Sequence, residues 1–314
     1  MDIKKLVCLL VTVCFAVSMA GCVKSPQEDL PQSEPVQTQQ PEPEPTPTPY
    51  SYPTVIYDLP IQWRDENLKH LIYDAMGWDY SKEVCPADFA SVRELFILSD
   101  QRILINQTPR WDLEPEENGT DYVWRGKTYT ESVSMNLDDL VNFLDLDTLK
   151  VCLVQLENTE FVAHIPNIKY LWLAGCGIED VTNIAKCSTV KELRLPGNNI
   201  SDISPLADMN LWDLFLPHNN ITDISPLADM FRLPEELVLS FNNISDITAL
   251  TPYNRSEALA YLNLRNNNIS DISPLAYYDS IGILSLSYNN ITDFSPINHL
   301  PYTNTIYRIG NPEG

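Results

Sequence analysis

A hydrophobic pattern of fixed spacing fills the second half of the chain. Leu193, Leu195, Asn198 and Ile200 define the frame L-x-L-x-x-N-x-I. The frame recurs with its first leucine at Leu214, Leu237, Leu262 and Leu284. The asparagines of successive copies are 21, 23, 25 and 22 residues apart. This period predicts a solenoid, because one such unit cannot bury its own apolar face whereas a stack of units can.

Each position of the frame has a physical role. The Leu-x-Leu segment predicts a short strand that turns two leucines inward and the residues around them outward. The asparagine amide can donate and accept hydrogen bonds, so stacked copies can satisfy buried backbone groups. Asp202 can bond the turn backbone, and Ser204-Pro205 is typical of a helix start in which the serine hydroxyl caps free N–H groups. We therefore expect a strand, a turn and a short helix in every unit.

This pattern resembles the leucine-rich repeat of the roughly 22-residue type found in internalin-like proteins of bacterial surfaces. The resemblance covers about residues 65–311 and is strongest over 193–296. It implies an α/β repeat solenoid with a parallel concave β-sheet, short helical or 3-10 segments on the convex side and an N-terminal helical cap. Relatives of this type suggest a role in adhesion.

Weaker copies precede and follow the clear ones. One copy has Cys176 at the asparagine position, and an earlier one keeps only a strand, with Cys152 assigned to an inward position. We expect these two cysteines and Cys187 to be small core residues, with a bridge between Cys152 and Cys176 as the alternative. Zinc is not favoured, since no pair has ligand spacing. Ile306 and Asn311 each lie 22 residues after their counterparts and predict one final strand.

The N-terminal residues have the features of an export signal. Two lysines precede an apolar run of 14 residues, 6–19, which is too short to span a bilayer. The segment Met19-Ala20-Gly21-Cys22 resembles the bacterial lipobox, which implies that residues 1–21 are removed and that Cys22 is lipidated. An ordinary signal peptide is the alternative. Two acyl chains would hold the protein on the extracellular side of the cell membrane.

We expect four segments in the chain. A lipoprotein signal peptide occupies 1–21, and the lipidated cysteine with a proline-rich linker occupies 22–60. An N-terminal helical cap is expected over 61–91 and the repeat domain over 92–314, with an insertion at about 99–131. The linker holds ten of the 24 prolines and predicts a semi-rigid polyproline tether.

Local signals support elements in the cap and in the insertion. Asp65 can begin a helix that ends at Gly77, and Pro86 begins a shorter one. Within the insertion, residues 122–124 and 128–130 flank a glycine-containing turn and predict a hairpin.

Composition and motifs argue against several classes of function. The net charge of −23 disfavours nucleic acid and anionic lipid as partners. The four histidines are scattered without a nucleophile motif, and no glycine-rich phosphate loop occurs, so we expect neither an enzyme nor a cofactor or metal site. The rival hypothesis places active groups among Asp112, Glu114, Glu116 and Glu117, but nothing in the sequence orients these carboxylates.

The residues around the inward leucines form the candidate site. Adjacent strands would place equivalent side chains about 4.8 Å apart on the concave face. The predicted partner-binding residues are Tyr170, Trp172, Glu192, Arg194, Asp213, Phe215, Glu236 and Tyr261. Aromatic and arginine side chains are the usual anchors of interfaces, and three acids in one row favour a basic ligand. We also expect Arg194 to lie between the rings of Trp172 and Phe215.

The sequence therefore predicts a surface lipoprotein that recognises a protein partner non-covalently. We expect this lipoprotein to be a monomer and to have no enzymatic activity. The alternative is binding of carbohydrate or cell-wall glycan, with the concave aromatic residues as stacking platforms. The sequence does not identify the partner.

Overall fold

The computed structural model describes residues 55, 57–106, 114–115, 122–124, 127–129, 133–251, 259–301 and 305–312. All of them belong to one compact unit, Ser51–Gly314. The predicted signal peptide, the lipidation site Cys22, most of the proline-rich linker and the side chains of the acidic cluster in the insertion lie outside the described residues.

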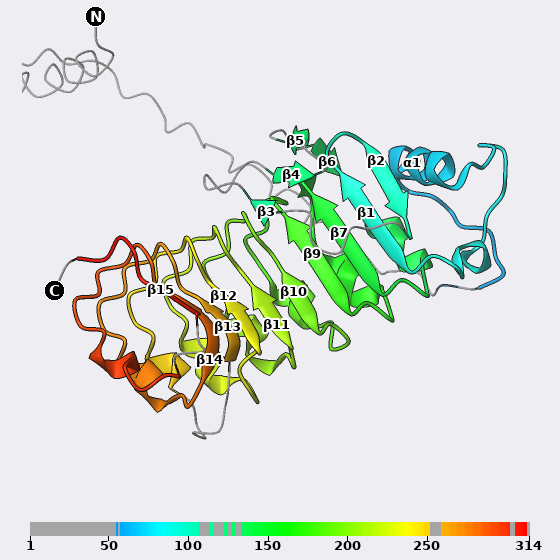
Figure 1. The fold of residues 1–314 in the computed structure, drawn as a ribbon. Coiled ribbons are helices and arrows are strands. Elements are labelled where there is room, and N and C mark those ends of the chain that lie inside the picture. The colour runs from blue at the N-terminus through cyan, green and yellow to red at the C-terminus, as the bar shows by residue number, and fades with distance from the viewer. Residues whose placement is uncertain are drawn as a thin grey trace, which may run out of the picture. The chain divides into compact units, whose positions relative to one another are not determined.

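A ten-stranded sheet forms one side of this unit (Figure 1). Its strands, in spatial order, are β15 (Thr305–Tyr307), β14 (Ile281–Ser285), β13 (Leu259–Asn263), β12 (Glu236–Val238), β11 (Asp213–Phe215), β10 (Glu192–Arg194), β9 (Tyr170–Ala174), β7 (Thr148–Cys152), β1 (Glu94–Leu98) and β2 (Arg102–Ile105). All neighbours are parallel except β1 and β2, which pair antiparallel. The strand β2 was not expected, although Arg102-Ile103-Leu104-Ile105 is apolar enough for an edge strand.

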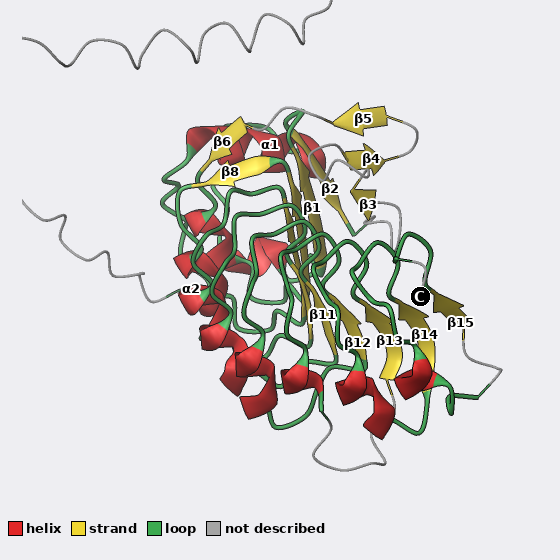
Figure 2. Cartoon of the chain, turned by 90° about the vertical axis from the view of Figure 1, so that its left-hand side faces the viewer, coloured by secondary structure: helices red, strands yellow, loops and turns green. Residues whose placement is uncertain are grey.

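Two smaller sheets accompany the large one. The first is antiparallel and consists of β3 (Glu114–Pro115), β4 (Tyr122–Trp124) and β5 (Lys127–Tyr129). The pair β4–β5 confirms the predicted hairpin. The second pairs β6 (Val133–Met135) with β8 (Val154–Leu156) in parallel. Figure 2 shows β3, β4 and β5 on the side of the large sheet that faces away from the row of short helices.

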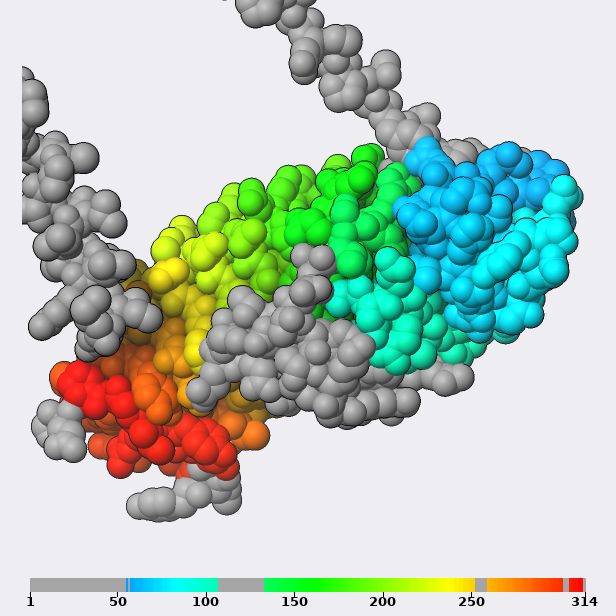
Figure 3. Space-filling view, turned by 90° about the horizontal axis from the view of Figure 1, so that it is seen from above, coloured from blue at the N-terminus to red at the C-terminus, as the bar shows by residue number. Residues whose placement is uncertain are grey.

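Short helices line the other side of the coil (Figure 2). The first helices in the described ranges are α1 (Glu66–Met76) and the 3-10 helix η2 (Pro86–Phe89). The repeats then contribute η3 (Asp138–Asn142), η4 (Glu160–His164), α2 (Thr182–Ala185), η5 (Ser204–Asp208), η6 (Ser225–Asp229), η7 (Thr248–Leu250), η8 (Ser273–Tyr277) and η9 (Ser295–Ile297). Colour changes steadily from the N-terminal to the C-terminal end in Figure 3, so the units stack in chain order.

The register aligns the inward leucines of all the repeats. Leu193 pairs with Leu171 on one side and with Leu214 on the other, and the alignment continues through Leu284 to Ile306. The leucines of this line that lie between β9 and β14 are at most 1% exposed. One continuous apolar core therefore runs between the sheet and the short helices, as the repeat predicted. The strand around Ile306 is the predicted final strand.

The repeated asparagines form a buried ladder of hydrogen bonds. The amide oxygen of Asn242 accepts the backbone N–H of Ile221 at 3.0 Å. Its amide nitrogen donates to the carbonyls of Leu216 at 2.9 Å and Leu239 at 3.1 Å. Asn311 repeats these contacts in the last coil, where its oxygen accepts from Ile291 at 3.1 Å. The predicted role of the asparagine is thus confirmed.

Aspartate, not serine, caps the repeated 3-10 helices. The carboxylate of Asp202 accepts the N–H of Ser204 at 2.8 Å, and Asp223 accepts that of Ser225 at 2.7 Å. The predicted role of the aspartate is confirmed. The predicted serine cap is wrong, because no side chain caps η5 in the usual way and Ile203 occupies the residue before it. The proline at the helix start is placed as expected.

The four cysteines in the described ranges are free, and one of them lies on an unexpected face. Cys176 and Cys187 are buried in the main core. Cys152, by contrast, belongs to a separate apolar cluster on the concave face. The inward positions of β7 are Leu149 and Val151, which pair with the inward leucines of β9, so the predicted inward position of Cys152 is wrong by one residue. The Cys152–Cys176 bridge does not form.

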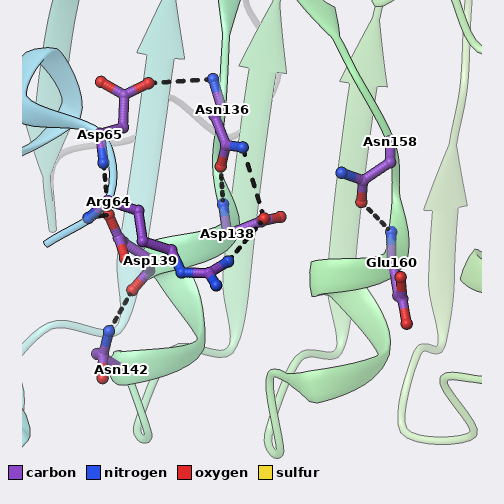
Figure 4. A network of polar contacts seen from close by, with 8 residues as sticks. All are labelled: Arg64, Asp65, Asn136, Asp138, Asp139, Asn142, Asn158 and Glu160. Atoms are coloured by element: carbon purple, nitrogen blue, oxygen red, sulfur yellow. Dashed lines mark hydrogen bonds and ion pairs between the residues drawn. The ribbon is translucent and has the colours of Figure 1, made fainter. Parts of the chain in front are cut away.

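A polar network connects the first helix to the first repeat helix (Figure 4). Asp65 caps α1 by accepting from Asn67 and Leu68 at 2.8 and 2.9 Å, and Gly77 ends the helix with φ of 69°. The backbone N–H groups of Arg64 and Asp65 donate to Oδ2 of Asp139 at 2.9 and 3.1 Å. Because Leu68 and Ile72 are fully buried in the same core as the repeats, α1 covers the N-terminal end of that core.

Candidate functional site

The predicted site residues form two adjacent rows on the concave face. We call Tyr170, Glu192, Asp213, Glu236 and Tyr261 the acidic row, and Lys150, Trp172, Arg194 and Phe215 the stacked row. Paired positions on neighbouring strands bring the members of each row together. All eight predicted residues are therefore neighbours on one surface, because every strand presents its non-leucine positions to the same side.

The stacked row alternates cations with aromatic rings. The guanidinium carbon of Arg194 lies 3.8 Å from the centroid of Phe215 and 5.4 Å from that of Trp172. The ammonium of Lys150 lies 5.1 Å from the Trp172 centroid, on the strand beyond it. Arg194 thus lies between the two rings as predicted, and both it and Trp172 are only 8% exposed.

The acidic row contains three carboxylates on three successive strands. Glu192 is neutralised by Arg194, whose Nε donates to its Oε1 at 2.6 Å. Asp213 is half-buried and lies between Glu192 and Glu236 in the register. Burial raises the pKa of Asp213 to about 6, with further contributions from Glu236 and Glu192 and an opposing one from Arg194. Among the described residues, the negative charge of the three carboxylates is therefore only partly compensated, by Arg194.

The acidic row continues toward the C-terminus with a neutral surface. Glu236 pairs with Tyr261, which pairs in turn with Ile283. The hydroxyl of Tyr261 accepts a hydrogen bond from the amide of Asn263 at 2.8 Å. Ile283 is 42% exposed, a large fraction for an isoleucine on a sheet. The face thus changes from charged at β10–β12 to apolar at β14.

Toward the N-terminus, the same face carries a compact apolar cluster. Phe96, Leu98 and Cys152 pack there with Trp172 and Ala174. Burial holds the pKa of the Cys152 thiol far above its usual range and raises that of Cys176 to about 12. Both thiols are therefore protonated at neutral pH and are poor nucleophiles. The indole N–H of Trp172 is buried and has no acceptor among the described residues.

Within the described part of the chain, no group of three or more histidine, cysteine, aspartate or glutamate side chains is arranged to hold a metal ion. The histidines lie apart: His218, for example, stacks on Phe241 with centroids 4.0 Å apart. None of the helices in the described ranges is long and apolar enough to cross a membrane.

Two functional candidates were absent from the predicted set. Lys150 was missed because the strand containing it was assigned in the wrong frame, so its alignment with Trp172 was hidden. Ile283 stood in the same sequence row as the acids, but an isoleucine in a strand gives no signal of exposure. Its exposed fraction depends on its neighbours in the folded sheet.

Comparison with known proteins supports the repeat fold. The family model for the Leucine Rich Repeat matches residues 258–278. Among solved structures, internalin C2 from Listeria monocytogenes is 24% identical with a TM-score of 0.58, and the match covers 79% of this chain and 93% of that one. An internalin, InlF, from the same organism is 21% identical with a TM-score of 0.51, over 80% and 83% of the two chains.

Among curated proteins, leucine-rich repeat-containing protein 56 from Homo sapiens is 39% identical over 67 residues. That match covers 21% of this chain and only 12% of the human protein. Together with the sheet and its repeats, these similarities show that the chain has a leucine-rich repeat fold of the internalin-like kind.

Proposed function

We propose that this leucine-rich repeat solenoid is a recognition module that binds a protein partner through the two rows on its concave face. The observation that carries the proposal is the stacked row, in which Trp172, Arg194 and Phe215 from three successive strands form one continuous contact. Tryptophan, tyrosine and arginine are the residues that most often dominate binding energy at protein interfaces. A solenoid presents such residues on a long surface, where separate contacts add together.

The proposal includes attachment to the cell surface through a lipid on Cys22. It rests on the export signal, the lipobox-like segment and the proline-rich linker in the sequence. A tether of this kind would hold the solenoid away from the membrane while leaving its concave face accessible. Adhesion is the role that fits such a placement. The proposal also includes a basic partner and a monomeric state of this protein.

Glycan binding is less favoured by the geometry of the rings. Sugar rings stack on open aromatic faces, whereas Arg194 lies against both Trp172 and Phe215, and Lys150 lies over Trp172. The thiols of Cys152 and Cys176 are buried and protonated, so neither is an activated nucleophile, and we propose no catalytic activity for this face.

A pull-down with the detergent-solubilised full-length protein tests the function. The bait is incubated with target-cell extracts, cross-linked, and compared with a variant carrying Trp172→Ala and Phe215→Ala. We expect the captured protein to disappear with the variant. A second variant, Tyr170→Ser, changes a side chain that is 38% exposed and should weaken capture without affecting folding.

A variant of the opposite face provides the matched control. Asp208→Asn with Asp229→Asn alters two exposed carboxylates at the ends of η5 and η6 and should leave capture unchanged. Capture that survives both concave-face variants would exclude the proposed site. For the anchor, Cys22→Ser should shift the protein from the membrane fraction to the soluble fraction.

A further inference from the structure

Two carboxylates of the acidic row form no ion pair with a cation among the described residues. Glu192 pairs with Arg194, and the neighbouring Glu235 pairs with Arg232 at 3.2 Å. Asp213 and Glu236, in contrast, face each other across β11 and β12 without an ion pair in the described part of the chain. Both are half-buried, so water screens their repulsion less than it does on an open surface.

An exposed apolar side chain lies along the same row. The register runs from Asp213 through Glu236 and Tyr261 to Ile283, so the isoleucine is three strands from the aspartate. Strands in a sheet are about 4.8 Å apart, which places the two positions about 14 Å from each other. Burying an isoleucine that is 42% exposed is favourable, because apolar area leaves water.

This distance fits one extended chain lying across the strands. An extended peptide advances about 3.3 Å per residue, so residues four apart are separated by about 13 Å. Alternate residues point to opposite sides, and positions i and i+4 therefore project toward the same surface. A helix is about 10 Å wide and would need about nine residues to cover the distance, so the narrow row matches an extended segment better.

From the charge and the spacing together, we propose that the acidic row binds an extended segment of the partner that has a lysine or arginine over Asp213 and Glu236 and a large apolar residue four positions away over Ile283. This inference rests on the proposed function and specifies the chemistry of its partner. The cation would neutralise the two uncompensated carboxylates, and the apolar side chain would cover the isoleucine. Nothing in the row sets the direction in which the peptide chain runs. The basic residue can therefore come before or after the apolar one in the peptide sequence.

A displayed library of random 12-residue peptides provides the test. It is selected against the detergent-solubilised full-length protein at pH 7.5, and the enriched sequences are aligned. We expect a basic residue and a leucine, isoleucine, valine, phenylalanine or methionine separated by four positions, in one order or the other. Enrichment without a basic residue, or with a basic and an apolar residue at an odd spacing, would overturn the inference.

Variants of the row then locate the contacts of an enriched peptide. Asp213→Asn with Glu236→Gln should weaken its binding at least tenfold, and Ile283→Ser should do so several-fold. The controls Asp208→Asn with Asp229→Asn, and Ile309→Ser at a site 71% exposed, make matched changes away from the row and should bind as before. Binding that the row variants leave unchanged would disprove the proposed contacts.

The same variants separate this inference from the function on which it rests. If the row variants still capture the cellular partner while Trp172→Ala with Phe215→Ala does not, the recognition face stands and the basic segment is wrong. If all concave-face variants capture the partner normally, both proposals fail. Asp213 gives one further readout, since acidification from pH 7.5 to 5 protonates it and should weaken peptide binding to the native protein but not to Asp213→Asn with Glu236→Gln.

Discussion

At the residue scale, one asparagine per repeat connects each coil to its neighbours. Asn219 accepts from the N–H of Ile200 at 3.1 Å and donates to the carbonyl of Leu195 at 2.9 Å. Leu195 directly follows β10, and Ile200 follows the turn beyond it. A buried polar group without a partner costs about 1–3 kcal/mol, so exchanging the asparagine for an apolar residue of similar size would destabilise the repeat.

Replacing Asn242 by alanine should lower the free energy of unfolding by about 2–4 kcal/mol, because several buried backbone groups lose their partners at once. Urea denaturation followed by circular dichroism measures this change. Asn243→Ala is the matched control, since that side chain is exposed, and it should change stability by at most about 0.5 kcal/mol. Equal effects of the two substitutions would mean that the ladder does not contribute to stability.

The carboxylate of Asp213 should make stability depend on pH in an unusual direction. Its pKa rises from an ordinary 3.8 to about 6 in the folded protein, so the folded state binds the proton more tightly than the unfolded state. The contribution of this group to stability is therefore greatest below about pH 4 and is lost as pH rises through about 6. Asp213→Asn removes the carboxylate and therefore the loss of stability that accompanies its ionisation.

We expect Asp213→Asn to raise the melting temperature at pH 7.5 and to have little effect at pH 4. Thermal denaturation at the two pH values measures the difference. Asp208→Asn is the control, because it also removes one negative charge. It should change the melting temperature only slightly, and by the same amount at both pH values. A melting temperature that rises for Asp213→Asn at pH 4 but not at pH 7.5 would contradict the assigned burial and repulsion.

At the scale of elements, aspartates fix how helices begin. Asp202 and Asp223 each hold the first N–H group of a 3-10 helix two residues ahead. Asp139 acts over a longer distance, because its carboxylate receives two N–H groups from the segment before α1, more than 70 residues earlier. Asp139 is only 3% exposed, and burial raises its pKa. The two hydrogen bonds and the positive charge of Arg64 lower the pKa, but burial has the larger effect.

Asp139→Ala should therefore loosen the attachment of α1 to the first repeat. Two N–H groups would lose their acceptor, and we expect a loss of about 2–4 kcal/mol in the free energy of unfolding. Hydrogen exchange should show faster exchange of the amides of α1, with those of β11 and β12 less affected. Glu83→Ala removes an exposed carboxylate from the same region and should leave exchange in α1 unchanged.

At the scale of the whole solenoid, stability depends on contacts between adjacent coils. Each strand from β9 to β14 pairs with the strands of the preceding and following repeats, and one continuous core connects them. In such an array, a defect in the middle weakens the coupling between the two sides. The C-terminal side is the smaller one, so it should open first.

Leu237→Ala tests this arrangement, since Leu237 is fully buried in β12. The loss should be about 2–5 kcal/mol, as for other leucines removed from a packed core. Hydrogen exchange should show β13, β14 and β15 losing protection before β1 and β7. Leu59→Ala, at a residue 54% exposed, is the control and should leave both groups of strands protected. Uniform loss of protection along the chain would mean that the solenoid unfolds as a single unit.

The sequence by itself determined the repeat, the inward leucines, the asparagine ladder and the two rows of the concave face. These features depend on local spacing, because a strand alternates its side chains and each coil adds one strand in register. The position of Arg194 between two rings followed for the same reason. Where the spacing was degraded, as around Cys152, the frame was misplaced and Lys150 was missed with it.

Only the tertiary structure decided how much of each side chain stays exposed and which charges are compensated. Among the described residues, Arg194 pairs with Glu192, whereas Asp213 and Glu236 form no ion pair, although all three acids look alike in the sequence. The exposure of Ile283, the raised pKa of Asp213 and the attachment of α1 by Asp139 likewise depend on groups that are distant in the chain. Burial and electrostatic energy are sums over neighbours in space, and the order of residues fixes those neighbours only after the coils have stacked.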